Sequence, residues 1–213
     1  YFVSKNFPDR EEAGTPNILG AITLGSAIHV LDSIGMDVIL KKDLEITNYA
    51  IQKMEKYKDI FVYGETDSNG CQRAGTISFN IVDMDHGLVA AILNDYFNIA
   101  VRNECFCAHP YVEKMLHMTH KEEIDQLDCL DNHLTWKVEP WMGMVRASIG
   151  LYNTTKDIDN LISALSTIIH NRSTLSNEYT INQSGDYQHK NFTFSSKDFF
   201  SLTGTIDKDI VSE

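Results

Sequence analysis

Two cysteines separated by one residue form the part of this sequence best suited to covalent chemistry. Cys105 and Cys107 follow Arg102 and precede His109. The thiolate is the reactive form of cysteine, and cationic groups nearby favour it by lowering the thiol pKa. Free cysteine also packs as a small hydrophobic residue. From the spacing alone the segment is therefore a nucleophile, a metal clip or a buried turn.

The metal interpretation depends on histidines near the two thiols. His109, His117 and His120 could add imidazole ligands to Cys105 and Cys107. The C-x-C-x-H spacing is not that of a zinc knuckle, however, and the sequence has no C-x-x-C pair to complete a four-ligand site. We therefore predict no metal site.

Composition limits the class of protein. A length of 213 residues allows one domain of ordinary size, with or without a tail. The net charge of -12 argues against binding to nucleic acid, because no basic stripe is present to neutralise phosphates. No apolar run approaches the roughly 18 residues of a membrane span. Four scattered cysteines are too few for a disulfide scaffold, so we expect a cytoplasmic protein.

Hydrophobic periodicity predicts alternating helices and strands that would position the thiols. We expect helices between the cap Asn17 and Gly35, at 36–57, at 86–97, after Pro110 and from about Asp157, and strands at 60–63, 76–82, 99–101 and 144–152. This order predicts an α+β fold with a small, mainly antiparallel sheet and helices on one face. We predict one domain over residues 1–171 and a polar appendage over 172–213 with one or two short strands.

Short motifs accompany these elements in a fixed order. They are Arg10-Glu11-Glu12-Ala13-Gly14-Thr15-Pro16-Asn17, Tyr63-Gly64, Ser78-Phe79-Asn80, Ile99-Ala100-Val101-Arg102, Cys107-Ala108-His109-Pro110, Val145-Arg146-Ala147-Ser148 and Tyr152-Asn153-Thr154. From about residue 8 to 170 the series resembles the C-terminal half of class V aminotransferase-fold enzymes, in the cysteine desulfurase and selenocysteine lyase branch. The resemblance implies the C-terminal domain of a fold-type-I enzyme that uses pyridoxal 5'-phosphate (PLP).

The resemblance also implies a reaction. Such enzymes act as homodimers, take sulfur or selenium from L-cysteine or selenocysteine, and release alanine. A sulfur acceptor protein is a further expected partner. By position, Cys107 matches the nucleophile that carries the persulfide, and Arg146 matches the arginine that binds the substrate carboxylate. Arg102 and His109, which flank the nucleophile, are assigned to the same substrate site.

Further carry-overs concern the cofactor. Gly14 and Thr15 match the segment that reaches the PLP phosphate in the partner subunit. The lysine that binds PLP lies upstream of this segment in the family, whereas only 13 residues precede Gly14 here. His120-Lys121 and His189-Lys190 lie on the wrong side of the motifs for that role. We therefore expect a C-terminal part of a longer enzyme, inactive alone.

Two departures leave alternatives open. Glu104 stands where the family commonly has glycine, and segment 111–143 is longer than in the best-known members and could form a lid or a dimer contact. The function could thus be that of another class V enzyme, an aminotransferase or lyase, or of a non-catalytic binding or assembly module on the same fold.

Overall fold

The structure is a computed structural model that describes residues 5–11, 14–64, 66, 73, 75–117, 143–182 and 185–192. Its elements in chain order are α1 (Ile18–Ile34), α2 (Met36–Met54), β1 (Ile60–Val62), β2 (Thr76–Ile81), α3 (His86–Phe97), α4 (His109–Leu116), β3 (Val145–Ser148), α6 (Thr155–His170), α7 (Arg172–Ser176), β4 (Tyr179–Ile181) and β5 (Tyr187–His189). Lys121, most of segment 111–143 and the end of the predicted appendage lie outside the described residues.

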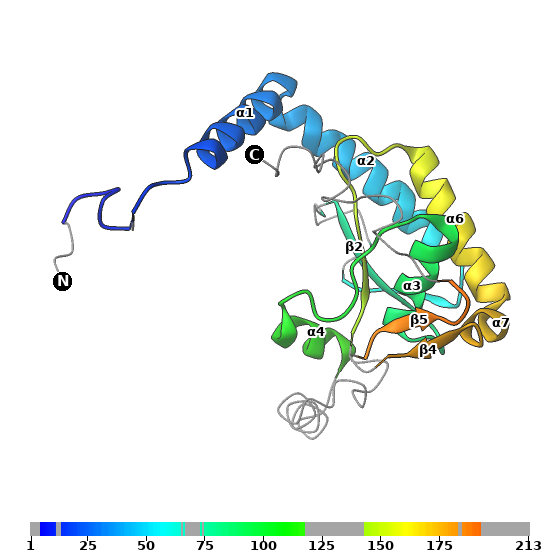
Figure 1. Cartoon of the computed structure of the whole chain (residues 1–213). Coiled ribbons are helices and arrows are strands. Elements are labelled where there is room, and N and C mark those ends of the chain that lie inside the picture. The colour runs from blue at the N-terminus through cyan, green and yellow to red at the C-terminus, as the bar shows by residue number, and fades with distance from the viewer. Residues whose placement is uncertain are drawn as a thin grey trace, which may run out of the picture.

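The main sheet is antiparallel, with the order β1-β2-β3 (Figure 1). Its register pairs Ile60 with Ile81 and Thr76 with Ser148. Alternation along the central strand β2 turns Ile77, Phe79 and Ile81 to one face, where they join a single core with residues of α2, α3 and α6. The predicted α+β fold, a small antiparallel sheet with helices on one face, is confirmed.

Helix α6 shows how the sequence specifies a buried helix. The Asp157 carboxylate accepts hydrogen bonds from the backbone N–H and the hydroxyl of Thr154, at 2.7 and 3.0 Å, which fixes the first turn. Apolar residues then recur on one side of the helix. The buried residues of this stripe include Ile158, Leu161, Ile162, Leu165 and Ile168.

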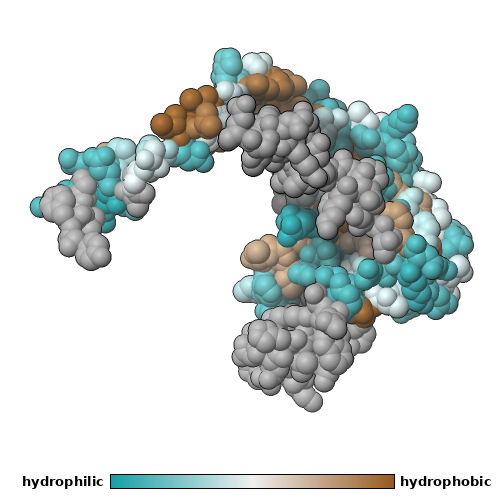
Figure 2. All heavy atoms as spheres, in the orientation of Figure 1, coloured by the Kyte–Doolittle hydropathy of each residue, from teal (hydrophilic) through white to brown (hydrophobic). Residues whose placement is uncertain are grey.

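Helix α1 has the predicted ends but no buried residue. The Asn17 side chain accepts a hydrogen bond from the Gly20 N–H at 2.9 Å, and the helix stops before Gly35, whose φ of 93° favours glycine. Its apolar side chains are exposed and form a patch (brown in Figure 2). Within the described part of the chain no single helix could cross a membrane, and α1 and α2 meet the length and composition test only as a pair bent by 78°.

The expected strand at 99–101 is wrong. Asn98 ends α3 in a left-handed conformation, with φ 53°, and the Ile99 N–H donates to the Leu93 carbonyl at 3.0 Å. Because this N–H caps the helix, it is not free to extend a ladder, and the segment pairs with β3 only at Arg102.

The short strands expected after residue 172 are present as the hairpin β4-β5. The hairpin packs against α3: the Tyr179 hydroxyl donates to Asp95 at 3.0 Å, and the Tyr96 hydroxyl lies 2.8 Å from His189 Nε2. Tyr179 is buried in the main core. This part of the chain is therefore continuous with the body of the structure.

Candidate functional site around Cys107

The segment that leads to the thiols is attached to the edge of the sheet. Arg102 and Arg146 exchange two backbone hydrogen bonds, of 3.0 and 2.7 Å, and the Met144 N–H donates to the Glu104 carbonyl at 3.1 Å. Residues 102–104 therefore run antiparallel to 144–146. This pairing brings together two predicted site segments that are more than forty positions apart in the sequence.

The backbone of the thiol loop is left-handed at three non-glycine residues. Glu104, Phe106 and Cys107 have φ values of 77°, 54° and 59°, and the Ala108 N–H closes a turn onto the Cys105 carbonyl at 2.8 Å. Left-handed φ is unfavourable for residues with a Cβ and is concentrated at functional sites. The φ of Glu104 is one that glycine adopts without strain.

The two thiols have different environments. Cys105 is buried with Val112 and Met144. Burial raises the pKa of the Cys105 thiol, and the carboxylates of Glu113 and Glu104 act in the same direction. Cys107 is exposed. The loop therefore presents one accessible thiol and keeps the other protonated in an apolar cluster.

Arg146 places a guanidinium beside this loop. Its side chain is half-buried, and its Cζ lies 4.8 Å from the centroid of the Phe106 ring. Its Nε is buried and has no hydrogen-bond partner among the described residues. A buried N–H without an acceptor is unfavourable, and a guanidinium edge matches a carboxylate. The arrangement fits an anionic ligand at Arg146.

Asn80 holds the start of β3, a role that we did not predict. Its amide donates to the Gly143 carbonyl at 2.9 Å and to the Tyr63 hydroxyl at 3.2 Å, and its Oδ1 accepts from the Val145 N–H at 3.3 Å. Burial raises the pKa of the Tyr63 hydroxyl, so this partner stays neutral. The signal was available, because Tyr63 and Asn80 both belong to the ordered motifs.

His86, another residue that we did not predict, packs against Gly143. A Cβ at position 143 would collide with the His86 ring, so glycine is needed there. Burial lowers the pKa of His86, although Asp85 and Glu104 act in the opposite direction. A neutral imidazole therefore lies under the start of β3. No motif marked this residue in the sequence.

The remaining predicted residues divide into two groups. Arg102 and His109 lie on either side of Cys107 along the chain, and both side chains are exposed. Gly14 and Thr15 lie before α1, on the segment that leads away from the sheet (dark blue in Figure 1). The structure thus brings Arg102, Cys107, His109 and Arg146 to one region and leaves Gly14 and Thr15 apart from it.

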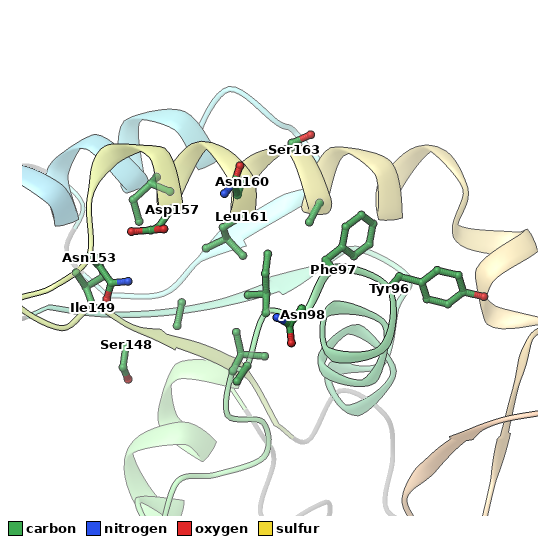
Figure 3. Close-up of a pocket in the computed structure, with 16 residues that line it drawn as sticks. Tyr96, Phe97, Asn98, Ser148, Ile149, Asn153, Asp157, Asn160, Leu161 and Ser163 are labelled. Carbon is green, nitrogen blue, oxygen red and sulfur yellow. The ribbon is translucent and has the colours of Figure 1, made fainter. Parts of the chain in front are cut away.

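A pocket of about 710 Å³ lies between α6, residues 96–101 and the end of β3 (Figure 3). Leu161 points into it from α6, and Asn98 and Asn153 lie at its polar edge. Cys107 and Arg146 are not among its lining residues. These two predicted site residues therefore lie outside this pocket.

Comparisons with known proteins agree on the family. Residues 1–161 match the family model for Aminotransferase class-V. A probable cysteine desulfurase of Halalkalibacterium halodurans is 37% identical over 161 residues, which are 76% of this chain and 32% of the relative. A probable cysteine desulfurase of Staphylococcus aureus is 36% identical over 174 residues, covering 77% of this chain and 34% of the relative.

The fold leads to the same family. The apo structure of a cysteine desulfurase from Thermococcus onnurineus NA1 aligns with a TM-score of 0.59 and 29% identity, over 76% of this chain and 34% of that one. The chain spans about a third of the length of the relatives that it matches. The family model covers most of the chain and includes the Cys107 loop and Arg146, so the chain belongs to the class V aminotransferase family.

Proposed function

We propose that the polypeptide carrying this chain is a PLP-dependent cysteine desulfurase with Cys107 as its nucleophile. The observation that carries the proposal is the backbone pairing of Arg102 with Arg146. It joins the segment that leads to an accessible thiol to the strand that carries Arg146, whose buried Nε has no partner among the described residues. The relatives named as probable cysteine desulfurases support the same reaction.

In this proposal Arg146 binds the substrate and Cys107 takes its sulfur. The guanidinium accommodates the carboxylate of L-cysteine with two parallel hydrogen bonds, which lysine cannot reproduce. The Cys107 sulfur then forms a bond to the substrate sulfur while the substrate Cβ–S bond breaks. The electron pair stays with that carbon, which takes a proton and becomes the methyl group of alanine. Cys107 is left as a persulfide.

PLP is the cofactor that the family implies, and it supplies an electron sink for the substrate when bound. Gly14 suits an approaching phosphate, because its φ is 84° and no heavy atom of the described residues lies within 4 Å of the place where a Cβ would be. Thr15 adds a hydroxyl. The segment that carries both residues leads away from the sheet in Figure 1, which supports a homodimer in which they serve the partner subunit's phosphate.

Further parts of the proposal concern partners and location. The exposure of Cys107 would let an acceptor protein collect the persulfide sulfur. The exposed thiol of Cys107 suits a reducing cytoplasm. Selenocysteine is the second substrate to be assayed, since its selenium occupies the position of the cysteine sulfur.

The test uses the complete polypeptide supplied with PLP. Alanine release from L-cysteine is measured for the wild type, Cys107→Ala and the matched control Cys105→Ala. We expect Cys107→Ala to reduce turnover to background and Cys105→Ala to keep most of it, since Cys105 is buried. Full turnover by Cys107→Ala would exclude this nucleophile. Transamination without sulfide release would favour another class V enzyme, and failure to bind PLP would favour a non-catalytic module.

A further inference from the structure

Phe106 links the two parts of the candidate site. Its ring lies under the Arg146 guanidinium, with 4.8 Å between Cζ and the ring centroid, and its peptide continues directly into Cys107. A guanidinium placed over an aromatic face is attracted by the ring electrons, and this contact leaves the N–H groups at the guanidinium edge available. The contact thus orients Arg146 without occupying its donors.

The loop backbone depends on how Phe106 is held. Phe106 and Cys107 are both left-handed, with φ 54° and 59°, a conformation that bulky residues avoid unless surrounding contacts impose it. Phe106 is half-buried against the cluster of Cys105, Val112 and Met144. The ring is therefore fixed on one side by this cluster and on the other by Arg146.

We propose that Phe106 is a positioning residue of the desulfurase site. Its ring holds the Arg146 guanidinium so that the buried Nε–H, which has no partner among the described residues, is left to pair with the substrate carboxylate, and its backbone fixes the Cys107 thiol relative to that carboxylate. The inference rests on the proposed function, because it assigns a means of alignment to the same two groups. It predicts that loss of the Phe106 ring both weakens carboxylate binding at Arg146 and displaces the Cys107 thiol.

The first measurement uses this chain alone and follows the Arg146 Nε–H by NMR. Protons of the Arg146 side chain should be shifted upfield by the Phe106 ring, and the Nε–H should respond when L-alanine is added as a carboxylate probe. Phe106→Leu keeps an apolar side chain but removes the ring, so we expect the upfield shift to disappear and alanine to bind about 5- to 10-fold more weakly. Phe106→Trp should restore both signals.

The second measurement uses the PLP-loaded complete polypeptide. We expect Phe106→Leu to raise the KM for L-cysteine and to lower kcat, and Phe106→Trp to recover both. Tyr111→Leu, on the exposed side of α4, is the matched loss of an aromatic ring and should change neither constant. A loss of stability without misalignment would leave the response of the Arg146 Nε–H to L-alanine unchanged in the folded variant.

The outcomes separate this inference from the proposed function. If the wild-type Nε–H ignores alanine, Arg146 does not bind carboxylates and the proposed function loses its substrate clamp. If the Nε–H responds equally to alanine in wild type and Phe106→Leu, then Arg146 binds carboxylates but Phe106 has no positioning role. A missing upfield shift in the wild type would overturn the stacking directly, even if the variant failed to fold.

Discussion

Helices α1 and α6 begin in similar ways and have opposite surroundings. Each starts with a side-chain hydrogen bond to the backbone of its first turn, from Gly20 N–H to Asn17 in α1 and from Thr154 N–H to Asp157 in α6. Six residues of α6 are buried, whereas α1 has none. Capping and helix-forming residues therefore specify a helix, but burial depends on what the fold places beside it.

The two helices also differ in how their apolar residues are distributed. In α6 they form one stripe, and polar residues occupy the other side, as expected for a helix on a sheet. In α1 the exposed apolar side chains are Ile18, Leu19, Ile22, Leu24, Ile28, Val30 and Ile34. Exposed apolar patches of this kind mark contact surfaces. Helix α1 thus has the surface of a buried helix without a covering element among the described residues.

The largest difference in stability is expected when a leucine is replaced by alanine in each helix. Leu165→Ala removes a side chain that is 0% exposed, so it should lower the free energy of unfolding by about 2–5 kcal/mol through lost burial and a cavity. Leu19→Ala removes one that is 78% exposed, so its effect should stay within about 0.5 kcal/mol. Urea denaturation measures both.

The result for Leu19→Ala can also contradict the view that α1 is exposed in solution. A loss above about 1 kcal/mol would mean that α1 is covered in solution. Repeating the denaturation at a lower protein concentration then identifies the cover, because stability that comes from self-association falls with dilution. Stability independent of concentration would instead place a segment of the same chain on α1.

A smaller difference is expected at the caps. Thr154→Ala removes a hydroxyl that donates to Asp157, and should lower the free energy of unfolding by about 1 kcal/mol because α6 is part of the core. Asn17→Ala should leave global unfolding unchanged and accelerate amide exchange at Gly20, which loses its acceptor. An equal loss of global stability in both variants would contradict the separation of α1 from the core.

The fold was largely predictable because its signals are local. Asn17 and Gly35 mark the ends of α1, and alternation in residues 76–82 marks β2. The error at 99–101 has a different origin. Those residues have strand-forming side chains, but the Ile99 N–H is used by the end of α3. Backbone hydrogen bonds to a neighbouring element cannot be read from side-chain patterns.

The candidate site was predictable only in part. Motif order placed Cys107 and Arg146 in one site before the structure showed their segments paired. Phe106 and His86 were missed, because their roles depend on contacts with Arg146 and Gly143 across the sheet edge. The spacing of residues along the chain predicts the reactive side chains, whereas the residues that contact and position them are identified only from the three-dimensional structure.

The smallest expected effect is a pH dependence of stability, which the start of α6 should show and the start of α1 should not. The Thr154 backbone N–H, followed by the Thr154 hydroxyl, lowers the pKa of the Asp157 carboxyl from its ordinary 3.8. The charged form is thus favoured in the folded state, so this stabilisation is complete above pH 3.8 and is lost as the pH falls through the lowered folded pKa. Asn17, the cap of α1, has no titrating group.

Asp157→Asn tests this difference, because asparagine keeps the shape of the side chain without its charge. Urea titrations of wild type and variant should give different free energies of unfolding at about pH 6, and this difference should narrow at about pH 3. The other carboxylates titrate alike in both proteins, so their contribution cancels in the difference. Exchange at Gly20 relative to the intrinsic rate should not change between the two conditions. If the gap persists in acid, the Asp157 charge is not what stabilises the start of α6. The capping hydrogen bonds alone would then distinguish the helices.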